Sequence, residues 1–293
     1  MNRPEGVAYH PAMPLALALL LLLLSGCAKD DAASGEPEAP AIPARERIEV
    51  PYALAEPDAR LTLAPRLREI SGLTVLEGGT LAAVQDEDGD VFELDPASGE
   101  ILSEQRFYNS GDYEGIERAG DTLWVVESDG DLYRITGADQ AEKFETGLKR
   151  SNDVEGLAYD ARGHRLLLAC KGDPGGGLDG VRAIYAYDLA SGALSESPLL
   201  TLDREALDRA SPFKPSGLAV HPLSGEVYVI SGVLTALVVL APDGDLRAAV
   251  ALPPRLFPQP EGIAFSPDGT LFISNEGGSG SATLLRFSPQ PQS

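Results

Sequence analysis

Near its C-terminal end the chain reads Gln259-Pro-Glu-Gly-Ile-Ala-Phe-Ser-Pro-Asp-Gly-Thr-Leu-Phe-Ile-Ser-Asn-Glu276. This stretch contains an opening phrase, a short apolar strand, a Pro-Asp-Gly turn and a second apolar strand. The phrase occurs five times, as Glu69-Ile-Ser-Gly-Leu73, Asp112-Tyr-Glu-Gly-Ile116, Asp153-Val-Glu-Gly-Leu157, Lys214-Pro-Ser-Gly-Leu218 and Gln259-Pro-Glu-Gly-Ile263. Its glycines, at 72, 115, 156, 217 and 262, are 43, 41, 61 and 45 residues apart. A period of about 40–45 residues is typical of propeller blades.

Each repeat continues with short strands and turns, which predicts an all-β domain. Second strands are expected at 81–84, 123–126, 166–169, 227–230 and 271–274, and third strands at 91–94, 132–135, 184–187, 237–240 and 284–287. A more polar fourth strand ends most repeats, for example at 101–107 and 246–252. The fifth repeat lacks one, but a spare strand, Arg60-Leu-Thr-Leu-Ala64, precedes the first repeat.

These features predict a five-bladed β-propeller of four-stranded antiparallel blades, whose ring is closed by the N-terminal strand. Closure of the ring would remove the unpaired strand edges that an open sheet exposes. Six blades are the alternative, if the 61-residue repeat contains a degenerate blade. The excess residues of that repeat favour loops, because they include the Gly-rich segment 171–180.

The first strand of each propeller blade lines the central channel, so equivalent residues of different blades meet around one axis. The residue before the repeated glycine is Ser71, Glu114, Glu155, Ser216 or Glu261. Three crowded carboxylates would raise one another's pKa, and a bound cation would remove that cost. Ca²⁺ accepts six to eight oxygen ligands in tolerant geometry. We therefore expect Glu114, Glu155 and Glu261 to bind Ca²⁺, with Asp112, Asp153 and Glu69 as possible second-shell or additional ligands. The alternative is that the Glu-Gly phrases have only a structural role at the start of each blade and bind no metal.

Composition excludes several classes of function. The formal net charge of −22 argues against nucleic acid as a partner. We find no nucleophile elbow, phosphate-binding loop or dinucleotide fingerprint. Cys170 lies in an apolar run, and its only possible partner, Cys27, has another predicted role, so no intrachain disulfide is expected.

The N-terminal segment predicts export and lipid anchoring. Residues 15–24 form an apolar core of signal-peptide length, and Leu24-Ser-Gly-Cys27 follows at once. This tetrapeptide resembles the lipobox of bacterial lipoproteins, in which the cysteine is acylated and the peptide is cut before it. The expected organisation is a signal peptide at 1–26, lipidated Cys27 with a flexible tether at 27–47, and a propeller domain at 48–293. Ala28 follows the cysteine, where an Asp would favour the inner membrane, so the outer membrane is the expected location.

The five phrases together resemble those of the SdiA-regulated (YjiK-like) family of bacterial β-propellers. The likeness extends over residues 60–288 and includes Phe265-Ser-Pro-Asp-Gly-Thr-Leu-Phe-Ile-Ser-Asn-Glu276. The resemblance implies a five-bladed propeller with a calcium site near the axis, at Glu114, Glu155 and Glu261. Serine at 71 and 216 leaves the ligand set incomplete. The resemblance implies no particular biochemical activity.

Two classes of function follow. The favoured hypothesis is a calcium-binding scaffold or binding module at the cell envelope. Its expected partner is an unknown small molecule or envelope protein, and the protein is expected to be a monomer. The alternative is a calcium-dependent hydrolase, similar to lactonase or phosphoesterase propellers, in which the cation polarises a carbonyl or phosphoryl oxygen. That alternative needs a general base near the metal, and Asp112, Asp153, Glu127 and Glu276 are the candidates.

The lipobox gives the first testable prediction. Cys27→Ser should abolish acylation and leave the protein soluble or unprocessed, because each buried acyl methylene contributes about 0.8 kcal/mol of membrane affinity. Fractionation after a carbonate wash, with mass spectrometry of the N-terminus, measures both properties. A processed Cys27→Ser protein that stays with the membranes would contradict the lipobox.

Overall fold

The computed structural model describes residues 49–203 and 213–291. The predicted signal peptide, Cys27 and the tether lie outside the described residues. Within the described ranges, every regular element is a β-strand except one 3₁₀ turn, Pro65–Leu67. None of the helices in these ranges has the length and apolar character needed to cross a membrane.

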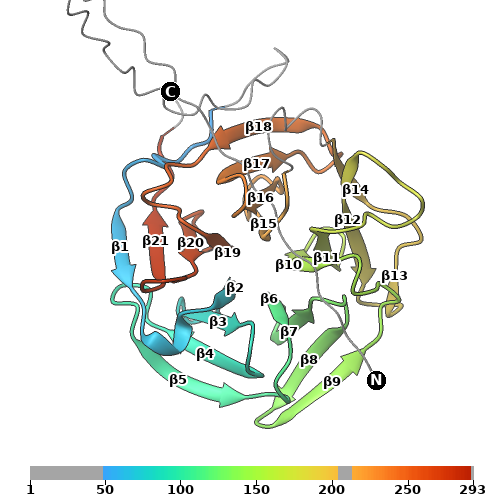
Figure 1. Cartoon of the computed structure of the whole chain (residues 1–293), viewed down its shortest axis with the longest axis horizontal. Coiled ribbons are helices and arrows are strands. Elements are labelled where there is room, and N and C mark those ends of the chain that lie inside the picture. Colours follow the sequence, from blue (N-terminus) through green and yellow to red (C-terminus); the bar gives the residue numbers. More distant parts are fainter. Residues whose placement is uncertain (1–48, 204–212, 292–293) are drawn as a thin grey trace, which may run out of the picture. The chain divides into compact units, whose positions relative to one another are not determined.

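The strands form five antiparallel sheets arranged as blades around a central axis, which confirms the predicted propeller (Figure 1). Blade 1 contains β2 (Ile70–Val75), β3 (Leu81–Gln85), β4 (Asp90–Leu94) and β5 (Ile101–Arg106). Blade 2 contains β6 (Tyr113–Ala119), β7 (Thr122–Glu127), β8 (Leu132–Gly137) and β9 (Gln140–Phe144). Blade 4 contains β15 (Gly217–Val220), β16 (Val227–Ser231), β17 (Ala236–Leu240) and β18 (Leu246–Ala251).

Blade 3 explains the long repeat. It contains β10 (Val154–Asp160), β11 (Arg165–Cys170), β12 (Val181–Asp188), β13 (Ala193–Leu194) and β14 (Leu200–Asp203). Both β13 and β14 pair with β12, so the outer edge of this blade is divided into two short strands. The extra residues therefore belong to a loop and a divided edge, and the ring has five blades rather than six.

Blade 5 closes the ring with a strand from the other end of the domain. It contains β19 (Pro260–Phe265), β20 (Leu271–Asn275), β21 (Thr283–Phe287) and β1 (Ala59–Thr62). β1 pairs antiparallel with β21, with Ala59 opposite Arg286 and Thr62 opposite Thr283. The closing strand predicted at 60–64 is confirmed, one residue earlier at its start and two at its end.

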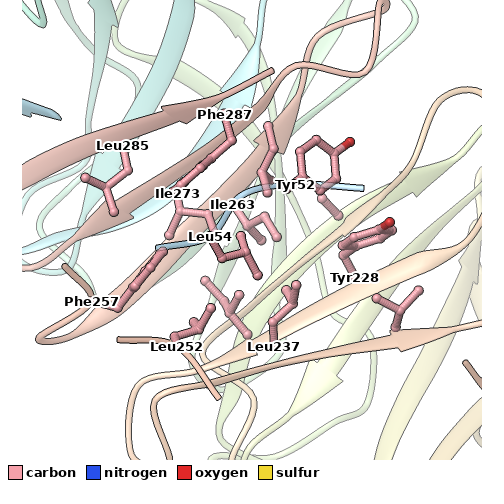
Figure 2. Close-up of a cluster of buried hydrophobic side chains, with 14 of the residues drawn as sticks. Tyr52, Leu54, Tyr228, Leu237, Leu252, Phe257, Ile263, Ile273, Leu285 and Phe287 are labelled. Atoms are coloured by element: carbon pink, nitrogen blue, oxygen red, sulfur yellow. The ribbon is translucent and has the colours of Figure 1, made fainter. Parts of the chain in front are cut away.

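The hydrophobic core consists of five clusters, one between each pair of neighbouring blades. Figure 2 shows the cluster between blades 4 and 5, where Leu237 and Tyr228 face Ile263 and Ile273. Tyr52, from the segment before β1, joins this cluster, and its hydroxyl donates to the carbonyl oxygen of Gly269 at 2.7 Å. The chain before β1 is therefore part of the folded domain from about this point.

Near the axis, each repeated glycine touches the inner strand of the next blade. A Cβ atom at Gly72 would lie 2.7 Å from the amide nitrogen of Ile116, and one at Gly217 would lie 2.2 Å from the carbonyl oxygen of Glu261. Gly115, Gly156 and Gly262 approach blades 3, 4 and 1 in the same way. The five contacts form a closed circle, so the phrase predicted from sequence marks the place where neighbouring blades approach each other most closely.

Gly217→Ala tests this contact. A Cβ atom forces the inner strands of blades 4 and 5 apart, and overpacking of this kind costs about 1–3 kcal/mol. Gly78→Ala is the matched control, because no atom lies within 4 Å of a Cβ atom at that position. Urea unfolding can be followed by the fluorescence of Trp124, the single tryptophan. Equal stability of the two variants would contradict the role of the glycine contacts.

Candidate functional site

In blades 1, 2, 3 and 5 the residue before the repeated glycine is displaced from the regular strand register. In β2, β6 and β10, and in β19 at the same place, the inner strand has residues without a partner on the second strand. These residues are Ser71, Glu114, Glu155 and, in β19, Glu261 with Gly262. Such β-bulges are frequent beside functional sites because they redirect one side chain. The glutamates of the predicted site are therefore placed by a local irregularity that three blades share.

The three predicted glutamates lie together around the channel, as expected. They line a space of about 10 Å³, which is roughly the size needed for one water molecule. Burial raises the pKa of Glu114 to about 10, with a smaller contribution from repulsion by Glu155. The same two causes raise the pKa of Glu261 to about 8. A positive charge at this point of the channel would therefore strongly stabilise the ionised carboxylates.

A lysine supplies part of that positive charge. The ammonium group of Lys171, in the loop after β11, donates to Oε1 of Glu155 at 2.7 Å. Burial raises the pKa of Glu155, and the ammonium of Lys171 opposes this effect. Lys171 also lowers the pKa of Glu114 and Glu261, although neither of these forms an ion pair with a described residue. One ammonium group thus interacts electrostatically with three carboxyl groups.

The two serines of the repeated phrase join neighbouring blades. The hydroxyl of Ser71 donates to the carbonyl oxygen of Tyr113 at 2.6 Å, and that of Ser216 donates to the carbonyl oxygen of Pro260 at 2.6 Å. Each bond joins an inner strand to the inner strand of the next blade. The two hydroxyls therefore connect blade 1 with blade 2 and blade 4 with blade 5.

The three predicted additional ligands lie where the inner strands begin, at one end of the channel. The carboxylate of Asp112 accepts a hydrogen bond from the hydroxyl of Ser128, and that of Glu69 accepts one from Nε of Arg68 at 2.9 Å. Asp153 has a φ of 53° and raises the pKa of Glu155. All three acidic residues therefore surround the entrance above the axial glutamates, and Asp112 and Glu69 have other partners.

Two more acidic side chains, Asp86 and Glu276, lie at this end of the channel. The Glu276 carboxyl is hydrogen bonded to that of Glu69, and burial together with this bond raises the pKa of Glu276 to about 7. Burial, and then Glu69, raises the pKa of Asp86 to about 6, and its Oδ1 atom is buried without a hydrogen-bond partner in the described structure. We call Glu69, Asp86, Asp112, Asp153 and Glu276 the acidic mouth.

Sequence reasoning missed Lys171 and Asp86 as members of the site, although an equivalence between blades points to both. The residue that follows the second strand donates its amide hydrogen to the carbonyl of the residue three positions before the repeated glycine. This bond joins Asp86 to Glu69, Ser128 to Asp112, Lys171 to Asp153 and Glu276 to Gln259. Alignment of the blades on the phrase and the second strand would have found the set.

Other side chains that could have contributed to the site lie away from the axial glutamates or are hydrogen bonded to other groups. Glu127, proposed as a general base, accepts a hydrogen bond from the hydroxyl of Tyr133. His221 is buried against Tyr52 and lies near the opposite end of the inner strands. Residues 86–89 form the turn between β3 and β4. Cys170 is a free, buried cysteine.

The axial residues fit a divalent cation in charge but do not form a ready coordination shell. If a bound cation kept all three glutamates ionised, they and the one ammonium would carry a formal charge of −2. Among residues 49–203 and 213–291, however, no group of three or more His, Cys, Asp or Glu side chains is close enough together to hold a metal ion. A cation would therefore need water ligands or small side-chain movements to complete its coordination.

Several solved structures have a similar fold. Glutaminyl cyclase of Myxococcus xanthus is 16% identical, with a TM-score of 0.58 over 81% of this chain and 97% of that chain. A luciferin-regenerating enzyme is 13% identical, with a TM-score of 0.53 over 80% of this chain and 95% of that chain. A gluconolactonase from Xanthomonas campestris is 17% identical, with a TM-score of 0.51 over 75% of this chain and 72% of that chain. At these identities the likeness concerns the fold alone.

A family model gives the more specific assignment. The SdiA-regulated family model matches residues 57–278, from just before β1 to just after β20. The match contains all five repeated phrases and the whole acidic mouth. By its repeat, its five blades and this match, the chain belongs to the SdiA-regulated family of β-propellers.

Proposed function

We propose that this protein is a lipid-anchored, calcium-binding propeller that acts as a binding or scaffold module at the cell envelope. The observation that carries the proposal is the crowding of three buried carboxyl groups, those of Glu114, Glu155 and Glu261, around one narrow space, which raises their pKa values and which a bound cation would relieve. The lipobox at Cys27 supports the anchoring, and an envelope protein or small molecule is the expected partner.

Calcium is the proposed cation because the donors available are oxygen atoms in an irregular arrangement. Glu114 and Glu261 would hold it, since neither is paired with an ammonium in the described structure. Glu155 would be shared between the cation and Lys171. When bound, Ca²⁺ would supply a Lewis acid able to hold and polarise an oxygen atom of a ligand.

The acidic mouth supports selection of the ligand by charge. Its five carboxyl groups belong to residues that adjoin the start of an inner strand or the end of a second strand. Without a cation they repel anions and attract positively charged or neutral groups. With a cation in place, an oxygen atom of a neutral or anionic ligand gains a favourable contact. The cation would thus decide which class of ligand is bound.

A calcium-dependent hydrolase is the second candidate, and the hydrogen-bonded pair Glu69–Glu276 favours it. One member of this pair has a pKa near 7, which suits general acid or base catalysis at neutral pH. Hydrolysis of a lactone or phosphoester that requires Ca²⁺ and is lost in Glu276→Gln, with the calcium response unchanged, would favour the hydrolase over the binding module.

Calcium binding is tested by thermal unfolding. A cation that binds only the folded state stabilises it by RT ln(1 + [L]/Kd), about 2.7 kcal/mol at a hundredfold excess over Kd. EDTA should therefore lower the melting temperature and added Ca²⁺ should restore it. Glu261→Gln should weaken this response, whereas Glu145→Gln, at an exposed position after β9, should preserve it. A wild-type melting temperature that ignores both EDTA and Ca²⁺ would overturn the proposal.

The pH dependence of the metal-free protein gives an independent test. The pKa of Glu261 is raised from 4.5 to about 8 in the folded protein, so its carboxyl is protonated there but ionised in the unfolded chain. The folded state then binds more protons, and the free energy of unfolding should fall as the pH rises from about 5 to 8. The slope is about 1.4 kcal/mol per pH unit for each such group.

Two comparisons isolate the axial site as the origin of this slope. Glu261→Gln should reduce the slope and, at pH 8 without metal, should be more stable than the wild type. Saturating Ca²⁺ should flatten the wild-type profile, because the bound cation favours the ionised carboxylates. Denaturant titrations at several pH values in EDTA measure the slope. A wild-type slope that Glu261→Gln leaves unchanged would contradict the assignment.

A further inference from the structure

A second site lies at the other end of the channel, where all five inner strands end. It is a pocket of about 400 Å³, within the range of small-molecule sites. Each inner strand contributes to its wall, through Val75, Arg118, Tyr159, Val220 and Phe265. We call this cavity the arginine pocket. The acidic mouth lies where the inner strands begin and this pocket where they end, so the two lie at opposite ends of the inner strands.

Two arginines of the pocket have no carboxylate partner. Arg118 donates from Nε to the carbonyl oxygen of Val75 at 3.3 Å and from Nη1 to that of Gly120 at 2.7 Å. Arg162 is exposed and donates to the carbonyl oxygen of Leu223 at 3.3 Å. Neither guanidinium forms an ion pair with any residue in the described ranges. In a chain with a net charge of −22, two cations without anionic partners in one cavity are unexpected.

None of the described acidic groups facing this pocket forms an ion pair with either arginine, although burial raises the pKa of the Glu117 carboxyl and the charge of Arg118 lowers it. Glu117 accepts hydrogen bonds from the Thr74 hydroxyl at 2.6 Å and from two main-chain amides, which joins blades 1, 2 and 3. Asp160 forms an ion pair with Arg165 at 2.8 Å. Glu77 is an exposed residue of the rim. Burial lowers the pKa of His221, so this side chain adds no positive charge at neutral pH.

The opposite wall of the pocket is apolar and firmly packed. Val220 and Phe265, from blades 4 and 5, form part of it. The ring of Phe265 lies 5.0 Å from those of His221 and Tyr228 and 6.1 Å from that of Tyr52, in edge-to-face or tilted contacts. Such contacts fix the ring in place. A flat apolar group entering the cavity would meet a preformed surface.

The axial glutamates and the arginine pocket are separate sites. The residue after each repeated glycine is a buried leucine or isoleucine, and these side chains lie between the two along the inner strands. They are Leu73, Ile116, Leu157, Leu218 and Ile263, each at most 4% exposed. Removal of a cation from the acidic end should therefore leave the arginine pocket unchanged.

We propose that the arginine pocket binds a small organic carboxylate with a flat apolar body. The carboxylate pairs with the guanidinium groups of Arg118 and Arg162, which are suited to bidentate hydrogen bonds with such an anion. The apolar body packs against the wall formed by Val220 and Phe265. The pocket thus selects both for negative charge and for apolar surface, which distinguishes it from the acidic mouth.

Three probes separate these contributions: naphthalene-1-acetate, its neutral amide naphthalene-1-acetamide, and acetate. Calorimetric titration of the full mature protein, in EDTA and in Ca²⁺, should show binding of naphthalene-1-acetate at least about tenfold tighter than binding of the amide. Acetate should bind more weakly than either aromatic probe. The affinity for naphthalene-1-acetate should be the same with and without Ca²⁺.

Two variants locate the site. Arg162→Gln changes an exposed side chain and should weaken binding of naphthalene-1-acetate about tenfold, while leaving the melting temperature and binding of the amide unchanged. Arg60→Gln, on the outer strand β1, is the matched control and should bind like the wild type. Arg118→Gln should also weaken binding, but it removes main-chain hydrogen bonds, so Arg162→Gln decides the test.

Three results would overturn the proposal. The first is equal affinity for naphthalene-1-acetate and its amide, which removes the role of charge. The second is unchanged affinity in Arg162→Gln. The third is loss of binding in Glu261→Gln or in EDTA, which would assign the probe to the acidic end of the channel. Failure of the calcium proposal alone leaves these measurements unaffected, because every one of them can be made in EDTA.

Discussion

The structure depends on how closely the five inner strands approach one another at the axis. Each repeated glycine lies against the main chain of the next blade, where a Cβ atom would collide. This approach closes the ring, and in blades 1, 2, 3 and 5 the preceding residue lies in a bulge of the inner strand. The side chains of Glu114, Glu155 and Glu261 are then gathered around a narrow space. The crowding of these carboxyl groups is thus a direct result of the geometry that closes the propeller.

The five blades use the same backbone position for two purposes. Where the residue before the glycine is serine, as at Ser71 and Ser216, its hydroxyl bonds to the main chain of the next blade. Where it is glutamate, its carboxylate joins the axial cluster and has a raised pKa. The serines therefore connect blades, and the glutamates create a demand for positive charge that the ammonium of Lys171 meets only in part.

The fold was predictable because the repeat is regular in both period and order. Predicted strands such as 81–84 and 227–230 end within one residue of β3 and β16, since a turn residue bounds each apolar run. The convergence of the three glutamates followed from the same equivalence. Lys171 was missed because it lies in a loop longer than its counterparts, and the arginine pocket because its residues share no motif and meet only after the ring closes. The inclusion of Tyr52 depends on a contact with Gly269, which no local pattern predicts.

The distribution of charge around the acidic mouth is asymmetric, and this limits where a cation would bind. In blade 3, Lys171 contacts Glu155. In blade 4 the equivalent positions hold two uncharged residues: Ser216 in place of Glu155, and Gly232 in place of Lys171. The carboxyl groups without an ammonium partner, among them Asp86, Glu114, Glu261 and Glu276, come from blades 5, 1 and 2. Repulsion among them is relieved most by positive charge on that side of the channel. A divalent cation is therefore expected near blades 5, 1 and 2, with the Glu69–Glu276 pair beside it, and a ligand held by the cation would contact this pair before it reached Lys171.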